Sequence, residues 1–344
     1  MYTSIYSNNI PPSITQLVKT PEMQRLDHVG MHCGVEYAGY PKYKNEICPY
    51  SRLTHSIGVA YIVWHFTHDL TMTIAGLLHD ISTPVFAHTI DFLNGDHLKQ
   101  ESTEEETRKI IENSKEIMEI LNRLNIMVDD VCDYHLYPIA DNDTPMLSAD
   151  RLEYTFGTAY VMYHLPTNEI KNIYDNIHLA TNEQGIAELA FDDISIAKRF
   201  THISLRNSHM FVDDEDRFSM QFLADIVRHA IKLNVITKAD LYTTEEIVID
   251  KMNTNNEIAK MWQEHTLTYS VLSSSTKPIG KYSVNIDAKK RYINSLVKTT
   301  GNGGIHYKRI MDIDKDIASE INTFLNMDFN RWLFAESVHH TSRI

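Results

Sequence analysis

The chain has 344 residues, which is long enough to bury a large core and to form two domains, or one domain with an appended region. A hydrophobic fraction of 43% indicates a globular chain, and 12 glycines are too few to favour a glycine-rich phosphate loop. The net charge of −14 argues against a general nucleic-acid-binding surface, although a bound cation can still attract a small anionic substrate.

The cysteines are few, odd in number and widely spaced: Cys33, Cys48 and Cys132. This usage indicates neither a disulfide framework nor a cysteine-type zinc site, so we expect a reducing, cytoplasmic environment. The N-terminal residues lack the basic and apolar regions of a signal peptide. No window has about 18 uninterrupted apolar residues, so no membrane span is expected.

Helical periodicity dominates the sequence. The segment 33–51 is the main early exception, since its Gly, Pro, Tyr and Asn content predicts an extended loop or short hairpin. Ser102 and Glu105 match a capping box and predict a helix start. Apolar residues recur at helical spacing from residue 55 and over 71–80, 85–91, 146–164, 190–208, 214–234, 244–264 and 313–326.

The pattern changes near residue 266. Residues 265–272 are rich in β-formers, and 282–286 alternate like an exposed strand. We therefore predict a mainly α protein with a helical domain over 1–265 and a small α+β C-terminal region over 266–344.

Four possible metal ligands stand in the order His, His-Asp, Asp: His55, His79, Asp80 and Asp150. Imidazole and carboxylate ligands together suit a hard or borderline divalent cation, and two ions are possible because an aspartate can bridge. Adjacent residues in a regular helix point in different directions, so joint ligation by His79 and Asp80 requires an irregular helix end. The dipeptide alone is weak evidence in a chain with 18 histidines.

Collinear motifs strengthen the hypothesis. The chain resembles the HD-domain phosphohydrolases, and within them the deoxynucleoside-triphosphate triphosphohydrolase branch, over about residues 20–260. The matching segments are 20–26 (TPEMQRL), similar to TPxxQRL; 52–59 (RLTHSIGV), similar to RxxHSxGV; 75–91, similar to AGLxHDxGHxPFSHxxE/D; and 150–154 (DRLEY), similar to DR/KxDY.

The resemblance implies an HD-type helical bundle in residues 1–265. It also implies a divalent metal held by His55, His79, Asp80 and Asp150. Mn, Fe, Ni, Mg and Zn all remain possible with these ligands.

The resemblance further implies a catalytic pair, His88 and Asp91, which share a face in a helix because they are three residues apart. A carboxylate beside an imidazole fixes its tautomer and raises its basicity. Arg52, Arg151 and Tyr154 match positions that hold substrate phosphates in the family.

The chain departs from the family at two histidine positions, which are Thr83 and Thr103 here. Glu104 is a candidate acid/base group that could replace them. Alternatively, Glu104 only fills the first turn of a helix, where negative charge is favoured.

These inferences predict a metal-dependent phosphohydrolase acting on a nucleotide, most concretely one that hydrolyses deoxynucleoside triphosphates to nucleoside and triphosphate. Two alternatives stay open: a phosphatase or phosphodiesterase for another phosphorylated small molecule, and a catalytically silent nucleotide-binding regulator. We expect a small phosphorylated partner, neither nucleic acid nor membrane, and, from the resemblance alone, a homo-oligomer.

Overall fold

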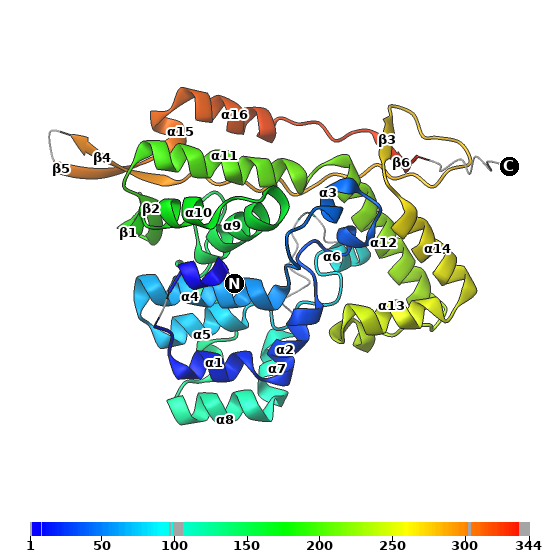
Figure 1. Ribbon diagram of the computed structural model, residues 1–344, viewed down its shortest axis with the longest axis horizontal. Helices are drawn as coiled ribbons and strands as arrows, with labels where there is room; N and C mark the ends of the chain where they lie inside the picture. The colour runs from blue at the N-terminus through cyan, green and yellow to red at the C-terminus, as the bar shows by residue number, and fades with distance from the viewer. Residues whose placement is uncertain (1, 8, 96–97, 99–105, 302–303, 337–344) are drawn as a thin grey trace.

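The computed structural model describes residues 2–7, 9–95, 98, 106–301 and 304–336 (Figure 1). The fold is mainly α with a small amount of sheet, as the sequence predicts. The helices before residue 175 are α1 (Pro12–Val18), α2 (Pro21–Arg25), α3 (Pro41–Lys44), α4 (Arg52–Thr67), α5 (Leu70–Leu78), α6 (Thr89–Asn94), α7 (Thr107–Asn113), α8 (Lys115–Leu124), α9 (Ala149–Tyr163) and α10 (Thr167–Tyr174).

The later helices are α11 (Ile194–Met210), α12 (Asp214–Lys232), α13 (Glu245–Asn253), α14 (Asn256–Leu267), α15 (Ile310–Ile313) and α16 (Lys315–Leu325). The strands are β1 (Ile177–Thr181), β2 (Ala187–Phe191), β3 (Val271–Ser274), β4 (Leu296–Gly301), β5 (Gly304–Arg309) and β6 (Trp332–Ala335). No helix in the described part of the chain has the length and apolar character needed to cross a membrane.

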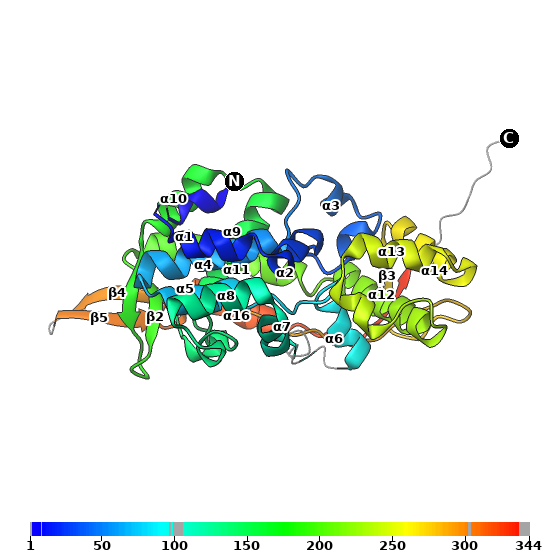
Figure 2. The same ribbon diagram turned by 90° about the horizontal axis from the view of Figure 1, so that it is seen from below.

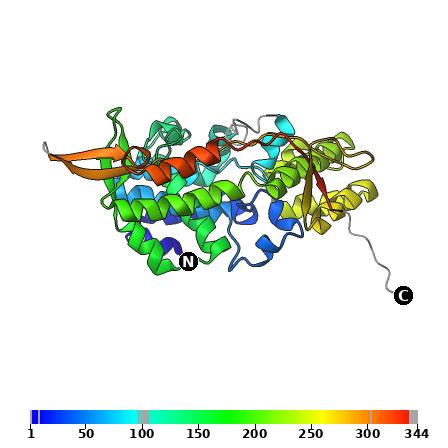
Figure 3. The ribbon, with the colours of Figure 1, turned by 90° about the horizontal axis from the view of Figure 1, so that it is seen from above.

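Helix α4 lies at the centre of a stack of helices. It packs on α5 along one side and on α9 along another, and α11 packs on both α9 and α16 (Figures 1 and 3). Beyond α5, helices α1 and α8 form the outer layer that is seen in front in Figure 2. A second group, made of α6, α12, α13 and α14, encloses its own apolar core. The two groups meet beside the N-terminal end of α4.

Local sequence explains where the central helices start and stop. Ser51 and Ser148 cap α4 and α9, since each hydroxyl accepts a hydrogen bond from the backbone N–H three residues later, at 3.2 Å. His68 ends α4 in the left-handed conformation. The first turns of α4 and α9 lie close together, since His55 Nε2 is 2.9 Å from Asp150 Oδ1.

The largest difference from the sequence prediction is a four-stranded sheet with the order β1-β2-β4-β5. Strands β1 and β2 form a hairpin in a region with no predicted strand, and the helix expected over 190–208 starts only at Ile194. Strand β2 is completed by a parallel pairing with β4, in which Ala190 lies opposite Leu296. A partner more than 100 residues away leaves no local signal in the sequence.

The C-terminal region is interwoven with the rest. Strands β4 and β5 extend the sheet that β1 and β2 begin, and α16 packs on α11. Strand β3 pairs with β6, whereas the strand expected over 282–286 is reduced to a bridge between Val284 and Leu333. The domain boundary at 265/266 stays a prediction.

A buried ion pair joins β2 to β5. Arg309 donates from Nη1 and Nη2 to the two carboxylate oxygens of Glu188, at 2.7 and 2.9 Å, and the Glu188 side chain is fully buried. The same guanidinium pairs with Glu183, whose side chain is 57% exposed.

We expect Glu188→Ala to lower the free energy of unfolding by about 3–5 kcal/mol, because it leaves a mostly buried guanidinium without its main partner. Glu183→Ala is the matched control and should cost about 0–1 kcal/mol, since water screens that pair. Urea unfolding followed by circular dichroism measures both. Equal costs for the two variants would contradict this assignment.

Candidate metal centre

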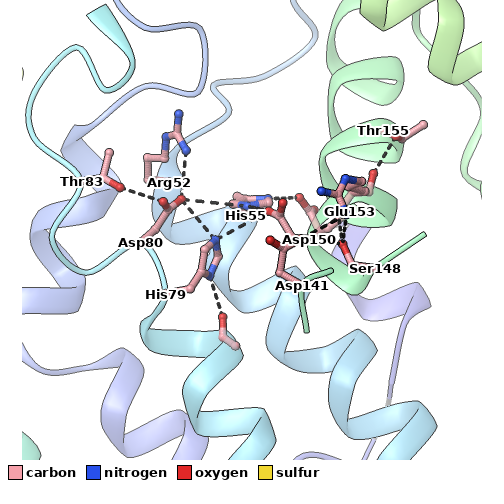
Figure 4. A network of polar contacts seen from close by, with 12 residues as sticks. Arg52, His55, His79, Asp80, Thr83, Asp141, Ser148, Asp150, Glu153 and Thr155 are labelled. Carbon is pink, nitrogen blue, oxygen red and sulfur yellow. Dashed lines mark hydrogen bonds and ion pairs between the residues drawn. The ribbon is translucent and has the colours of Figure 1, made fainter. Parts of the chain in front are cut away.

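Three helix ends bring the predicted ligands together (Figure 4). His55 lies in the first turn of α4, His79 directly follows α5, and Asp150 lies in the first turn of α9. Ligand atoms of His55, His79 and Asp80 lie within 4.8 Å of one another, and all three residues are buried. Helix α5 ends at Leu78, so Asp80 leaves the helical path and can face the same point as His79.

Asp150 closes the cluster from the side of α9. Its Oδ1 lies 2.9 Å from His55 Nε2 and 3.7 Å from His79 Nε2. On the opposite side, Asp80 Oδ2 lies 3.6 Å from His79 Nε2 and 4.0 Å from His55 Nε2. The two imidazole Nε2 atoms therefore point into a space bounded by two carboxylates.

Hydrogen bonds on the outer ring nitrogens orient both imidazoles. His79 Nδ1 lies 2.8 Å from the carbonyl oxygen of Gly76, and His55 Nδ1 lies 2.5 Å from Glu153 Oε2. A carbonyl or carboxylate oxygen at this distance accepts the Nδ1 proton, so Nε2 is the ring nitrogen turned toward the cluster. Tyr50 also donates to Glu153 Oε2, at 2.6 Å.

Glu153 is a further candidate site residue that the sequence reasoning did not identify. Its side chain is fully buried beneath His55, and this close approach needs Gly58, where an added Cβ would lie 2.5 Å from Glu153 Cγ. The available signal was the three-residue spacing from Asp150, which places both carboxylates on one face of α9.

Positive groups beside the two aspartates of the cluster oppose the effect of burial on their pKa values. Burial opposes ionisation of Asp80, but Arg52, which donates to its Oδ2 at 3.1 Å, and His79 hold the pKa of Asp80 well below its usual range. Burial likewise opposes ionisation of Asp150, but its contact with His55 lowers the pKa of Asp150 to about 2. Both carboxylates are therefore ionised at neutral pH.

This donor set fits a divalent cation. Metal bonds of about 2.0–2.2 Å place two ligands of one ion about 3–4 Å apart, which matches the separations in the cluster. Two imidazole nitrogens and two carboxylates suit a hard or borderline ion and do not select among Mn, Fe, Ni, Mg and Zn. The cluster is thus a candidate centre for a divalent metal of undetermined identity.

We expect Glu153→Gln to weaken metal affinity by about 10–100-fold, because it removes the negative charge that supports His55. Titration of the metal-free protein with the metal ion, monitored by calorimetry, measures the change in affinity. Glu169→Gln removes a surface carboxylate that pairs with Arg199, and it should leave the affinity unchanged. An unaltered affinity in Glu153→Gln would show that Glu153 serves packing alone.

His88 and Asp91 form the expected contact, with His88 Nδ1 2.8 Å from Asp91 Oδ2. The helix predicted over 85–91 is wrong in its first half, since Phe86 and Ala87 have positive φ angles of 60° and 43° and α6 begins only at Thr89. The turn is held from outside, because Glu245 accepts from the Phe86 N–H at 3.2 Å. Such strained turns persist where tertiary contacts over-determine them.

One cavity joins the two groups of residues. His55 and Asp150 of the metal cluster line it together with His88, and so do Arg52 and Tyr154, two of the three predicted substrate-binding residues. The third, Arg151, does not line this cavity. Its guanidinium donates to Asn142 at 2.6 Å and lies 3.3 Å from Asp141.

Besides Arg217 of α12, two cations of the C-terminal region line the cavity, Lys289 and Arg291. The sequence reasoning missed both, because they lie in the C-terminal region, more than 130 residues after Asp150. Apolar side chains cover another part of the wall: Met31, Phe92, Phe211 and Met220.

Of the two positions where this chain has threonine in place of the family's histidine, the structure describes only Thr83. Thr83 donates from Oγ1 to Asp80 Oδ1 at 2.7 Å, so it orients the carboxylate of a predicted ligand. Thr103 and Glu104, with the capping box at Ser102, lie outside the described residues. The acid/base role of Glu104 therefore stays a prediction.

Comparisons with known proteins identify a domain family in the region that holds the cluster. Residues 52–153 match the HD domain family model, a range that contains all four predicted ligands. The metal-dependent phosphohydrolase cns2 of Cordyceps militaris is 25% identical over 190 residues, which cover 54% of this chain and 52% of that protein. The uncharacterized protein YdhJ of Bacillus subtilis is 24% identical over 258 residues, 74% of this chain and 75% of that one.

A crystal structure of a hypothetical protein from Aquifex aeolicus has the same fold, with a TM-score of 0.64 at 16% identity over 95% of this chain and 93% of that one. The HD domain built around this ligand cluster defines the class of protein. The HD domain over residues 52–153 and the similarity to a metal-dependent phosphohydrolase support a hydrolase of the HD superfamily.

Proposed function

We propose that this protein hydrolyses nucleotides, and most concretely that it converts deoxynucleoside triphosphates to nucleoside and triphosphate. The observation that carries the proposal is the single cavity in which His55 and Asp150 lie with His88, the predicted acid/base group. The apolar wall of the same cavity offers a surface for a nucleobase. The choice of deoxynucleoside triphosphates rests on the motif resemblance.

His55, His79, Asp80 and Asp150 hold the divalent metal in this proposal. When bound, the metal would polarise a phosphoryl oxygen and lower the pKa of a coordinated water. Arg52 and Thr83 fix the Asp80 carboxylate from two sides, so it is already oriented for ligation.

His88 transfers the proton. Because Asp91 accepts from Nδ1, the Nε2 atom of His88 carries the lone pair and can take a proton from a water or, once protonated, deliver one to a leaving oxygen. Asp91 is fully buried and holds the ring orientation.

Arg52 and Tyr154 contact the substrate. Burial raises the pKa of Tyr154 to about 12, although neighbouring arginines oppose the shift, so the hydroxyl keeps its proton and can donate to a phosphate oxygen. Arg52 offers a planar donor group beside Asp80.

One observation favours a second candidate. Thr83 occupies a position where the triphosphohydrolase branch has a histidine, and its hydroxyl is committed to Asp80. A hydrolase without that histidine is compatible with a phosphatase or phosphodiesterase acting on another small molecule. A homo-oligomer in the cytoplasm remains part of the proposal.

Product analysis tests both candidates. The purified protein is incubated with deoxynucleoside and ribonucleoside triphosphates, with Mn²⁺, Mg²⁺, Ni²⁺ or Fe²⁺ added separately, and with Asp80→Ala as the control. Release of triphosphate that is lost in the control supports the first candidate. Orthophosphate or monophosphate supports the second, and saturable binding without product under every metal indicates a regulator instead.

A further inference from the structure

A segment of the C-terminal region forms part of the wall of the metal-centre cavity. Residues 286–291, here named the strap, belong to the chain that runs between β3 and β4 along the length of the molecule (Figure 1). Within the strap, Ala288, Lys289 and Arg291 line the same cavity as His55 and His88. Tertiary structure thus adds two cations to a site whose predicted ligands all lie before residue 151.

The strap is held at both ends. At its start, the buried Arg217 donates from Nη1 to the carbonyl oxygen of Ile286 at 2.7 Å. Near its end, Lys290 donates to the carbonyl oxygens of Leu325 and Met327, at 2.7 and 2.6 Å. These contacts fix the backbone, so the side chains on the cavity side are positioned before a ligand arrives.

The charged side chains of the strap differ in what they contact. Lys290 lies over the ring of Phe329 and donates to backbone carbonyls at and just beyond the end of α16. Lys289 and Arg291, the residues on either side of it, line the cavity. Two positive charges therefore occupy one wall of a site in a protein with a net charge of −14.

Arg291 acts on the other residues of the site. Its charge opposes protonation of His88, alongside burial, and opposes the upward shift that burial imposes on the pKa of Tyr154. Arg291 is thus within electrostatic range of both the predicted acid/base group and a predicted substrate contact. The metal ligands His55 and Asp150 line the same cavity as the strap.

We propose that Lys289 and Arg291 bind the non-reacting phosphates of the substrate, so that the strap selects nucleotides that carry more than one phosphate. This inference rests on the proposed function, because the reacting phosphoryl group is taken to lie at His55, His79, Asp80 and Asp150. A phosphate chain that extends from there meets the strap, and the nucleobase is left to the apolar wall. Arg suits this role because its planar group donates two parallel hydrogen bonds to phosphate oxygens.

Equilibrium binding tests the proposal independently of turnover. Calorimetry with inorganic triphosphate, dATP and dAMP is carried out on the metal-loaded protein and on Lys289→Gln, Arg291→Gln and Lys308→Gln. We expect each strap variant to weaken the binding of triphosphate and dATP by about 10–100-fold. The affinity for dAMP should change by less than about threefold, since it has no phosphate to reach the strap.

Lys308 is the matched control, since it is an exposed lysine of β5 and its substitution removes the same charge from the chain. Thermal unfolding of all variants verifies that the strap variants are folded. Unchanged triphosphate affinity, an equal loss for dAMP and dATP, or no triphosphate binding by the parent protein would each overturn the proposal. If triphosphate binding depends on the strap but no nucleotide is hydrolysed, the role of the strap is upheld and the proposed reaction is refuted. If nucleotides are hydrolysed and the strap variants bind triphosphate as the parent does, the reaction is upheld and the role of the strap is refuted.

Discussion

Asp80→Asn should lower kcat/KM by at least about a thousandfold and reduce the bound metal to a trace. The reason is that the substitution removes one of two carboxylates facing the imidazoles, and a metal ion contributes several kcal/mol of transition-state stabilisation, where about 4 kcal/mol corresponds to a thousandfold. The amide keeps the size of the side chain and an oxygen that can accept from Arg52 or Thr83. Metal content by mass spectrometry and steady-state kinetics measure the two effects.

The control for this experiment is Asp250→Asn, which removes an exposed carboxylate from α13. It should keep both metal and activity. Arg52 is buried beside this carboxylate, so the substitution could also destabilise the fold. Circular dichroism of Asp80→Asn therefore distinguishes loss of metal from loss of fold. A folded Asp80→Asn protein with full metal content and full activity would refute the assignment of the centre.

His88→Gln should lower kcat by about 10²–10⁴-fold while metal content is retained, since general acid–base catalysis contributes this much and His88 is not among the predicted ligands. Burial lowers the pKa of His88, and Arg291 and Arg52 add to the shift, whereas Asp91 opposes it. The ring is therefore neutral at neutral pH. As a base it loses activity only when the pH falls through this lowered pKa, below its ordinary value of about 6.5.

The acidic limb of the pH profile provides the matched comparison. Asp91→Asn removes the charge that favours the protonated ring, so the limb should move to lower pH. Arg291→Gln removes a charge that disfavours it, so the limb should move to higher pH. His88 would be excluded as the proton-transfer group if the acidic limb moved in the same direction in Asp91→Asn and Arg291→Gln. A His88→Gln protein with normal kcat would exclude it as well.

The site residues predicted from sequence lie in short motifs that resemble those of a known family. His88 and Asp91 are three residues apart and share a helical face, whereas the joint role of the adjacent His79 and Asp80 rests on the motif resemblance. The match of residues 52–153 to the HD domain agrees with the resemblance of the motifs. The ligand roles themselves remain to be tested by the substitutions above.

Side-chain direction was harder to predict than identity. Arg151 sits in a motif that binds phosphate in the resembled family, yet Asn142 and Asp141 engage its guanidinium here. Glu153 lies two residues further along the same helix and is turned toward His55. Motif position did not reveal this difference, since it depends on Gly58 of another helix leaving room for Glu153.

The sequence by itself determined the mainly α class and the positions of the central helices, because helical periodicity is a local property, and its motifs supplied the candidate ligands through their resemblance to a known family. Only the tertiary structure decided that β2 pairs with β4, that Phe86 and Ala87 form a left-handed turn before His88, and that Lys289 and Arg291 reach the cavity. Each of these features depends on a contact with a segment more than 100 residues away. Such contacts arise from packing and leave no periodic signal in the residues that make them.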